Sequence, residues 1–338
     1  MIGGRDVAQT TTQDFLTLDS NCHQGSPNRR QADFNCMKYQ YYTCDVFTET
    51  RFGGNPLAVL PRAAGLSDRQ MQQIAREFNY SETAFVFPPD AGHTRRVRIF
   101  TPTQEVPFAG HPNVGTAFVL ATTGELGDLR SLSAVTFEEK AGLVPISILT
   151  SNDKVISCEL RAPHLVSFEH TISAKMIASA VSLAEEDILT RSHEPQLVSA
   201  GLPFIMAELS DRSALERCHV NMMGFADILA IVKDPVRASV YGYTRTTGDV
   251  NVCARVFAPL SGMPEDPATG SATCAAVGLL AHLDKQASGE FTYALAQGAE
   301  MGRPSKLLAR AQKTNGVVTA TWVGGSCVMV SEGFIHVD

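Results

Sequence analysis

The sequence predicts an α+β fold built from two similar domains, and three observations lead to this prediction. One segment occurs twice: residues 97–117 read VRIFTPTQEVPFAGHPNVGTA, and residues 254–276 read ARVFAPLSGMPEDPATGSATCAA. Segments of strand character alternate with helical segments, separated by many Gly and Pro turns. The chain has 338 residues, 44% of them hydrophobic, which exceeds the usual size of one domain. Matching segments at this separation indicate two domains that face each other across a cleft.

The first half contains the most clearly defined helix. Ser67 and Gln70 form a capping-box pattern, and Asn79 suits a left-handed closing position, so we expect this helix to end at about residue 79. The apolar residues that recur at helical spacing are Met71, Ile74, Ala75 and Phe78. The other elements expected here are strands at 40–48, 57–61, 81–89 and 97–100, a turn at 52–56 and a small-residue helix at 112–121.

The second half repeats this order. Residues 201–209 and 240–245 have strand character, residues 213–231 contain helical patches, and the second copy of the repeated segment ends in another helix start. Strands around 143–160 lead to a crossover near residues 160–170. Residues 1–36 are polar and lack the apolar core of a signal peptide, so we expect a disordered extension there.

Charge and cysteine content limit the partners. The 28 Lys and Arg residues against 35 Asp and Glu give a net charge of −7, which offers no basic surface to nucleic acid or to an anionic membrane. The eight cysteines are scattered without metal-ligand spacing, and we expect reduced thiols in a cytoplasmic protein. The sequence contains no dinucleotide, P-loop or H-E-x-x-H motif. We therefore expect a small-molecule substrate without a cofactor or metal.

Glu82, in NYSETAF, is the first candidate for chemistry. It lies at a junction between helix and strand, directly before a run of Ala, Phe, Val and Phe. Partial desolvation there raises the pKa of a carboxyl group towards values useful for proton transfer. The alternative is an exposed or ion-paired glutamate at the edge of a strand.

The two helix starts are the other candidates. Gly110 permits close approach of the backbone, and Pro112 after His111 suits the first position of a helix. Free N–H groups at that position favour an anion such as a carboxylate. His111 then steadies the ligand or takes part in proton transfer, or else it is a hydrogen-bonded loop histidine. Asp266, in EDPATGSA, precedes the second helix start, where ordinary N-capping is the alternative.

At these residues the chain resembles the phenazine-biosynthesis isomerase-like (PhzF-like) proteins of the diaminopimelate epimerase superfamily. The resemblance covers residues 39–338. The matching stretches, in family order, are YYTCDVFTETRFGGNPLAV, FNYSETAFV, RIFTPTQEVPFAGHPNVGTA, EKAGLVPI, SAGLPFI and EDPATGSA.

The resemblance implies two pseudo-symmetric domains, each a barrel-like sheet around a central helix, with the active site between them. We expect a first domain at 37–162, a second at 163–325, and a last strand, about 326–338, that returns to the first. It also implies a cofactor-free isomerase, usually a homodimer, that acts on a small carboxylic acid. The family's catalytic residues fall on Glu82, His111 and Asp266. The residues implied to bind substrate are Asn55, Ser81, Gly110, Gly270 and Ser271.

One departure from the superfamily affects the mechanism. Its racemases and epimerases use two cysteines, and here Ala109 and Thr269 occupy those positions. Neither residue is a thiolate base, which favours a proton shuttle through Glu82 alone. The alternatives are an amino-acid racemase or epimerase, with Asp266 or His111 as a second base, and a catalytically silent protein that binds small acids.

Overall fold

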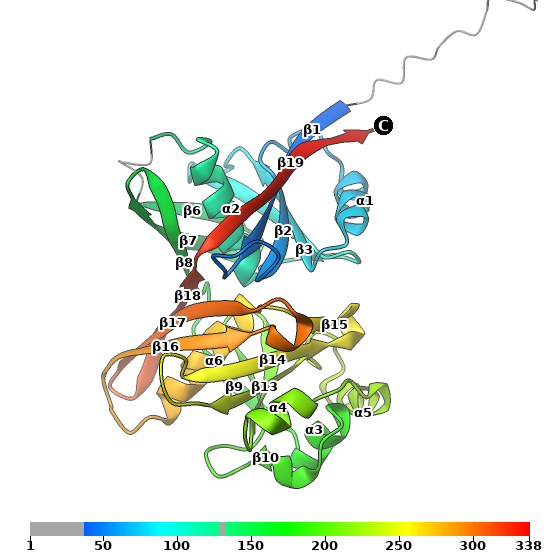
Figure 1. Ribbon diagram of the computed structural model, residues 1–338, viewed down its shortest axis with the longest axis vertical. Coiled ribbons are helices and arrows are strands. Elements are labelled where there is room, and N and C mark those ends of the chain that lie inside the picture. Colours follow the sequence, from blue (N-terminus) through cyan, green and yellow to red (C-terminus); the bar gives the residue numbers. More distant parts are fainter. Residues whose placement is uncertain (1–36, 129–132) are drawn as a thin grey trace, which may run out of the picture. The chain divides into compact units, whose positions relative to one another are not determined.

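The fold is a mixed α and β architecture with a large sheet and few helices (Figure 1). The computed structural model describes residues 37–128 and 133–338, and residues 37–337 form one compact unit. The extension predicted at residues 1–36 lies outside the described residues.

The strands repeat one topology twice. The first set is β1 (Met37–Val46), β2 (Asn55–Leu60), β3 (Glu82–Phe87), β4 (Arg95–Phe100), β5 (Glu105–Val106), β6 (Ala134–Glu139), β7 (Gly142–Ser151) and β8 (Lys154–Arg161). The second set is β11 (Gln196–Ser199), β12 (Pro203–Leu209), β13 (Val240–Arg245), β14 (Val252–Ala258), β15 (Met263–Asp266), β16 (Gly289–Gln297), β17 (Ser305–Thr314) and β18 (Val317–Gly325). In the first set β2 pairs in parallel with β3, and β4 pairs in parallel with β6. In the second set β12 pairs in parallel with β13, and β14 pairs in parallel with β16. The other pairings within each set are antiparallel.

The remaining strands tie the two sets together. After β8, the strand β9 (Ser167–Thr171) pairs with β11 of the second set. After β18, the last strand, β19 (Cys327–Val337), pairs with β1 of the first set. The short β10 (Ile188–Leu189) pairs with β12, and β8 pairs with β18. The chain therefore passes from each set to the other after the eighth strand.

Six α-helices accompany these strands: α1 (Asp68–Phe78), α2 (Gly110–Thr122), α3 (Ala174–Ala180), α4 (Arg212–Arg217), α5 (Met222–Val232) and α6 (Gly270–Leu283), the count covering the described part of the chain. The capping box of α1 and its left-handed Asn79 are present, so that prediction is confirmed. The predicted start of α2 at residue 112 is wrong by two residues. Pro112 is the third helical residue, and it is tolerated there because the first N–H groups of a helix have no partner within the helix.

The helices α2 and α6 are the central helices of the two halves. Every residue of α2 except the last is buried, and so is α6 from Gly270 to Ala281. Both helices belong to one hydrophobic cluster with strands of their own set. Figure 1 shows each helix among these strands. The predicted fold class is confirmed, whereas the domain boundaries at residues 162 and 325 stay predictions.

Two further properties bear on the expectations from the sequence. No helix of the described residues is long and apolar enough to cross a membrane. The described cysteines are free thiols, and they are Cys44, Cys158, Cys218, Cys253, Cys274 and Cys327. Cys22 and Cys36 lie outside the described residues.

Candidate active site

The N-termini of the two central helices meet at the predicted site. A Cβ atom added to Gly110 would lie 2.6 Å from Ser271 N and 2.7 Å from Gly270 Cα, so only glycine fits. In the described structure, neither N-cap residue, Ala109 or Thr269, gives its helix a side-chain cap. The first N–H groups of both helices are thus buried side by side, at the positive ends of two helix dipoles.

Glu82 and His111 form a close pair beside these helix ends. Glu82 is the first residue of β3, and its side chain is 14% exposed. Its Oε2 atom lies 3.5 Å from Nδ1 of His111, which is 3% exposed. Asn55 Nδ2 lies 3.2 Å from the same ring nitrogen, and it donates to Asp266 Oδ1 and to Ala268 O, each at 2.8 Å. Within the described chain, Glu82 Oε2 is buried without a hydrogen-bond partner, so it remains available to a ligand.

Asp266, the last residue of β15, accepts three hydrogen bonds from side chains of the cluster. Its Oδ1 accepts hydrogen bonds from Asn55 Nδ2 at 2.8 Å and from Ser81 Oγ at 3.0 Å. Its Oδ2 accepts one from Thr269 Oγ1 at 2.5 Å. Asn55 therefore contacts both His111 and Asp266, and it joins the two halves of the chain. The structure brings together all eight residues that the sequence nominated.

The turn before Asn55 holds this residue in place. Gly54 has a φ of +59°, and a Cβ there would lie 2.3 Å from Val46 O, so the turn requires glycine. Arg303, from the second half, donates to the carbonyl oxygens of Gly53 and Gly54, each at 2.8 Å. The same guanidinium donates to Asp45 Oδ1 at 2.5 Å. Asn55 is thus fixed from both halves.

Burial determines the protonation states of the cluster. It lowers the pKa of His111 to about 3, which outweighs the opposing effect of the Pro56 backbone, so the imidazole is neutral at neutral pH. Burial raises the pKa of Glu82 well above its usual range, and the Asp266 carboxylate adds to this rise. Burial also raises the pKa of Asp266 to about 6, although its three hydrogen-bond donors oppose the rise. Glu82 therefore holds its proton to a higher pH than an exposed glutamate does.

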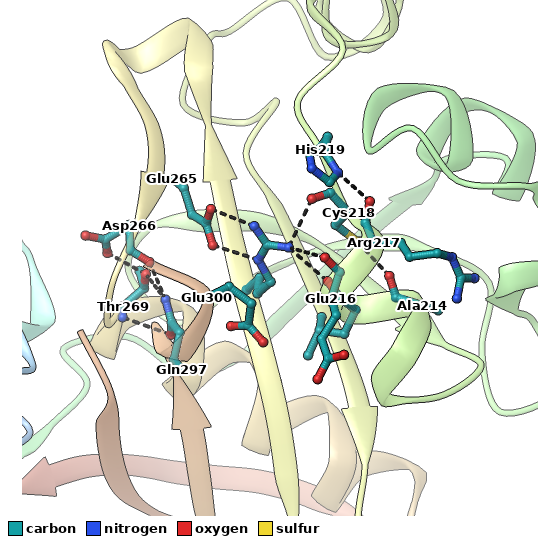
Figure 2. A network of polar contacts seen from close by, with 12 residues as sticks. Ala214, Glu216, Arg217, Cys218, His219, Glu265, Asp266, Thr269, Gln297 and Glu300 are labelled. Carbon is teal, nitrogen blue, oxygen red and sulfur yellow. Dashed lines mark hydrogen bonds and ion pairs between the residues drawn. The ribbon is translucent and has the colours of Figure 1, made fainter. Parts of the chain in front are cut away.

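A bidentate Arg–Glu ion pair lies before each central helix in the sequence. Arg98 on β4 binds Glu105 with two hydrogen bonds of 2.8 and 2.7 Å, and Arg255 on β14 binds Glu265 with two of 2.7 and 2.8 Å. Figure 2 shows Glu265 beside Asp266. Glu105 and Glu265 each lie five residues before the first residue of the following central helix.

Glu139, at the end of β6, is a half-buried acid that no sequence pattern indicated. Both its carboxyl oxygens are buried without a hydrogen-bond partner among the described residues. Burial raises its pKa well above the usual range, and the nearby Asn113 side chain on α2 only partly offsets this. The folded protein therefore holds the Glu139 proton to a higher pH than the unfolded chain does.

We expect Glu139→Gln to stabilise the protein above neutral pH. The unfolded chain loses this proton above a pH of about 4.3, whereas the folded state keeps it, so the free energy of unfolding falls by up to about 1.4 kcal/mol per pH unit until the folded pKa is reached. The amide removes this fall. Urea denaturation from pH 4 to pH 8 should show a variant that is more stable at pH 8 and equal to the wild type near pH 4, whereas two parallel curves would contradict the assignment.

A cavity of about 640 Å³ lies elsewhere in the described structure. It is lined by Phe47–Gly53, Gly302, Pro304–Lys306, Leu308, Gly325 and Ser326. None of these belongs to the polar cluster around Glu82. The cluster is therefore identified by its chemistry and not by cavity size.

With this geometry established, comparison with known proteins decides the family. The model of the family described as phenazine biosynthesis-like protein matches residues 44–333. The chain belongs to this family. An uncharacterized isomerase of Mesorhizobium japonicum is 36% identical to the chain over 303 residues, covering 88% of the chain and 98% of the relative. The trans-2,3-dihydro-3-hydroxyanthranilate isomerase of Pseudomonas aeruginosa is 32% identical over 299 residues, covering 87% and 98%.

Solved structures share the fold of this chain. The PhzF-family phenazine biosynthesis protein of Bacillus anthracis aligns with a TM-score of 0.78 at 26% identity, over 88% of this chain and 99% of its own. A hydroxyproline epimerase of Agrobacterium vitis shares the fold, with a TM-score of 0.62 at 13% identity, over 89% and 92%. The PhzF-like resemblance and the prediction of an isomerase are thus confirmed.

Proposed function

We propose that this protein moves a proton within a small carboxylic acid, without a cofactor, by general acid/base catalysis through Glu82. The observation that carries the proposal is the buried Glu82 carboxyl, whose Oε2 has no hydrogen-bond partner among the described residues and lies beside His111 at the two helix ends. The raised pKa makes the ionised form of Glu82 a strong base.

The proposed step follows from this arrangement. Glu82, as the carboxylate, takes a proton from an acidic C–H bond, and the electron pair of that bond moves into the adjoining unsaturated system. The neutral Glu82 then returns the same proton to another carbon on the same face. The N–H groups around Gly110 and Ser271 bind the substrate carboxylate, and burial restricts exchange of the proton with water.

The contacts of Asp266 favour a role in orienting the neighbouring side chains over a role as a second base. Three donors already occupy its two oxygens. A carboxylate with about four acceptor sites keeps little capacity to take a proton from carbon. This favours the single-base isomerase over the alternative of a two-base racemase.

Turnover in D₂O tests the function. We would incubate the full chain with trans-2,3-dihydro-3-hydroxyanthranilate and with a panel of small unsaturated, hydroxy and amino acids, and follow each by proton NMR and chiral chromatography. We expect a constitutional isomer of one unsaturated acid. Inversion of an amino acid without any other change would favour the racemase, and binding without turnover would favour the silent binding protein.

The dependence of kcat/KM on pH gives a second test. Since Glu82 must be ionised and its pKa is raised, activity should increase with pH through a step well above the usual range of a glutamate. Asp266→Asn removes a negative charge that contributes to this rise, so the step should move to lower pH in the variant. A step that stays in place or moves upward would show that Asp266 does not act on Glu82.

The homodimer and the cytoplasmic location expected from the sequence remain predictions. Sedimentation of the full chain tests the first, with two chains per particle as the expected result. Fractionation of the source cells tests the second.

A further inference from the structure

Gln297, the last residue of β16, contacts the turn that carries Asp266 (Figure 2). Its side chain is buried, with 3% of the residue exposed. The amide oxygen accepts a hydrogen bond from Thr269 N at 3.1 Å, and Nε2 donates to Asp266 O at 2.8 Å and to Thr269 Oγ1 at 3.1 Å. Every hydrogen bond of this amide therefore goes to residues 266–269.

These contacts fix the direction of the Thr269 hydroxyl. A hydroxyl has one hydrogen to donate, and here its oxygen already accepts from Gln297. The hydrogen is directed to Asp266 Oδ2, 2.5 Å away. A chain of donors thus runs from Gln297 through Thr269 to Asp266, and each bond polarises the next.

The internal repeat places a similar group in the first half. In the parallel pair of β14 and β16, Val252 lies opposite Leu295, and in the equivalent pair of β4 and β6, Arg95 lies opposite Phe137. Two residues further along, Gln297 therefore corresponds to Glu139. Each half thus carries an amide or carboxyl side chain at this position. Among the described residues, the Gln297 amide makes three hydrogen bonds there and the Glu139 carboxyl makes none.

We propose that Gln297 is a positioning residue, which sets the direction of the Thr269 hydroxyl and thereby holds the Asp266 side chain as a fixed hydrogen-bond acceptor at the site. Its relevance to catalysis rests on the proposed function, but the positioning itself does not. The charged or titratable groups that face Asp266 are Glu82 on β3, His111 on α2, through Asn55, and the neighbouring Glu265, which is paired with Arg255. All of them stay in place in the variants below.

The test is a carboxyl ¹³C NMR titration of the full chain without substrate, labelled at the side-chain carboxyl of aspartate. The Asp266 signal is identified by its loss in Asp266→Asn. Thr269→Val should raise the pKa of Asp266 by about 1 to 2 units, because a hydrogen bond to a charged group contributes about 1.5 to 3 kcal/mol. Gln297→Met should raise it by about half a unit, because only the polarisation and the fixed direction are lost. Thr269→Ser and the exposed Gln286→Met should titrate like the wild type.

The double variant is decisive. If Gln297 acts through the hydroxyl, Thr269→Val combined with Gln297→Met should titrate like Thr269→Val alone. An unchanged pKa in Gln297→Met, or an equal shift with and without the hydroxyl, would overturn the proposal and leave Gln297 as a purely structural contact. Should Gln297→Met fail to fold, Gln297→Glu keeps the acceptor for Thr269 N and competes for the hydroxyl. The shift that Gln297→Glu causes in the pKa of Asp266 should be smaller when Thr269→Val is also present. An equal shift in both backgrounds would again overturn the proposal.

This titration needs no turnover, so its failure is distinct from failure of the proposed function. Loss of activity in Glu82→Gln with no response of Asp266 to Gln297 would reject only the positioning. A responsive Asp266 in a protein that turns over no acid would reject only the function.

Discussion

Glu82→Gln should fold normally and lose about 10²- to 10⁴-fold in kcat on the acid identified in D₂O, because general acid/base catalysis typically contributes that much. The amide has the shape of the carboxyl but takes no proton from carbon. It also leaves no charge in a buried position, so we expect thermal unfolding at or above the temperature of the wild type near pH 8. Steady-state kinetics and calorimetry on the same preparation give both values.

Glu77→Gln is the matched control, because Glu77 is an exposed residue of α1. It should keep full activity. A folded Glu82→Gln protein with the activity of this control would exclude Glu82 as the proton carrier.

Gly110→Ala should lower kcat by at least about 10²-fold, even though it adds only a methyl group. The new Cβ would lie 2.6 Å from Ser271 N and 2.7 Å from the Gly270 carbonyl carbon, and backbone atoms cannot rotate away. The two helix ends must separate, and a misplacement of about 1 Å in a catalytic arrangement costs on the order of 10²-fold. Overpacking should also lower the free energy of unfolding by about 1 to 3 kcal/mol.

Gly242→Ala serves as the control for this variant. Gly242 is also buried, but its added Cβ would come no closer than 3.5 Å to a neighbour, the Leu209 side chain. It should keep activity and stability near the wild-type values. Equal activity in both variants would mean that contact of the two helix ends does not matter to the reaction.

Local sequence patterns predicted the fold well where structure depends on local chemistry. The Ser67 capping box and the left-handed Asn79 defined α1, because caps depend on neighbouring residues only. The predicted start of α2 is wrong because Pro112 suits the first position of a helix, whereas α2 begins two residues earlier, where Gly110 packs against Gly270. The exchange of β9 and β19 between the two sets depends on pairing across long stretches of chain, which no local pattern encodes.

The candidate site likewise contains residues that the sequence indicated and residues that it did not. Its eight residues came from the repeat and from the family resemblance, and the structure places them in one cluster. Gln297 and Glu139 gave no signal, because a lone Gln or Glu at the end of a strand is common and its burial appears only in three dimensions.

Transfer of labelled hydrogen within one substrate molecule tests the central claim most directly. The acid would carry deuterium at the carbon that loses the proton, and a single turnover would be run in ordinary water with excess protein, followed by mass spectrometry of the product. If Glu82 carries the proton in an enclosed site, a measurable share of the product should hold deuterium at the new carbon, and this share should vanish in Glu82→Gln. Complete replacement by solvent hydrogen on the opposite face, with Glu82→Gln still active, would contradict the account.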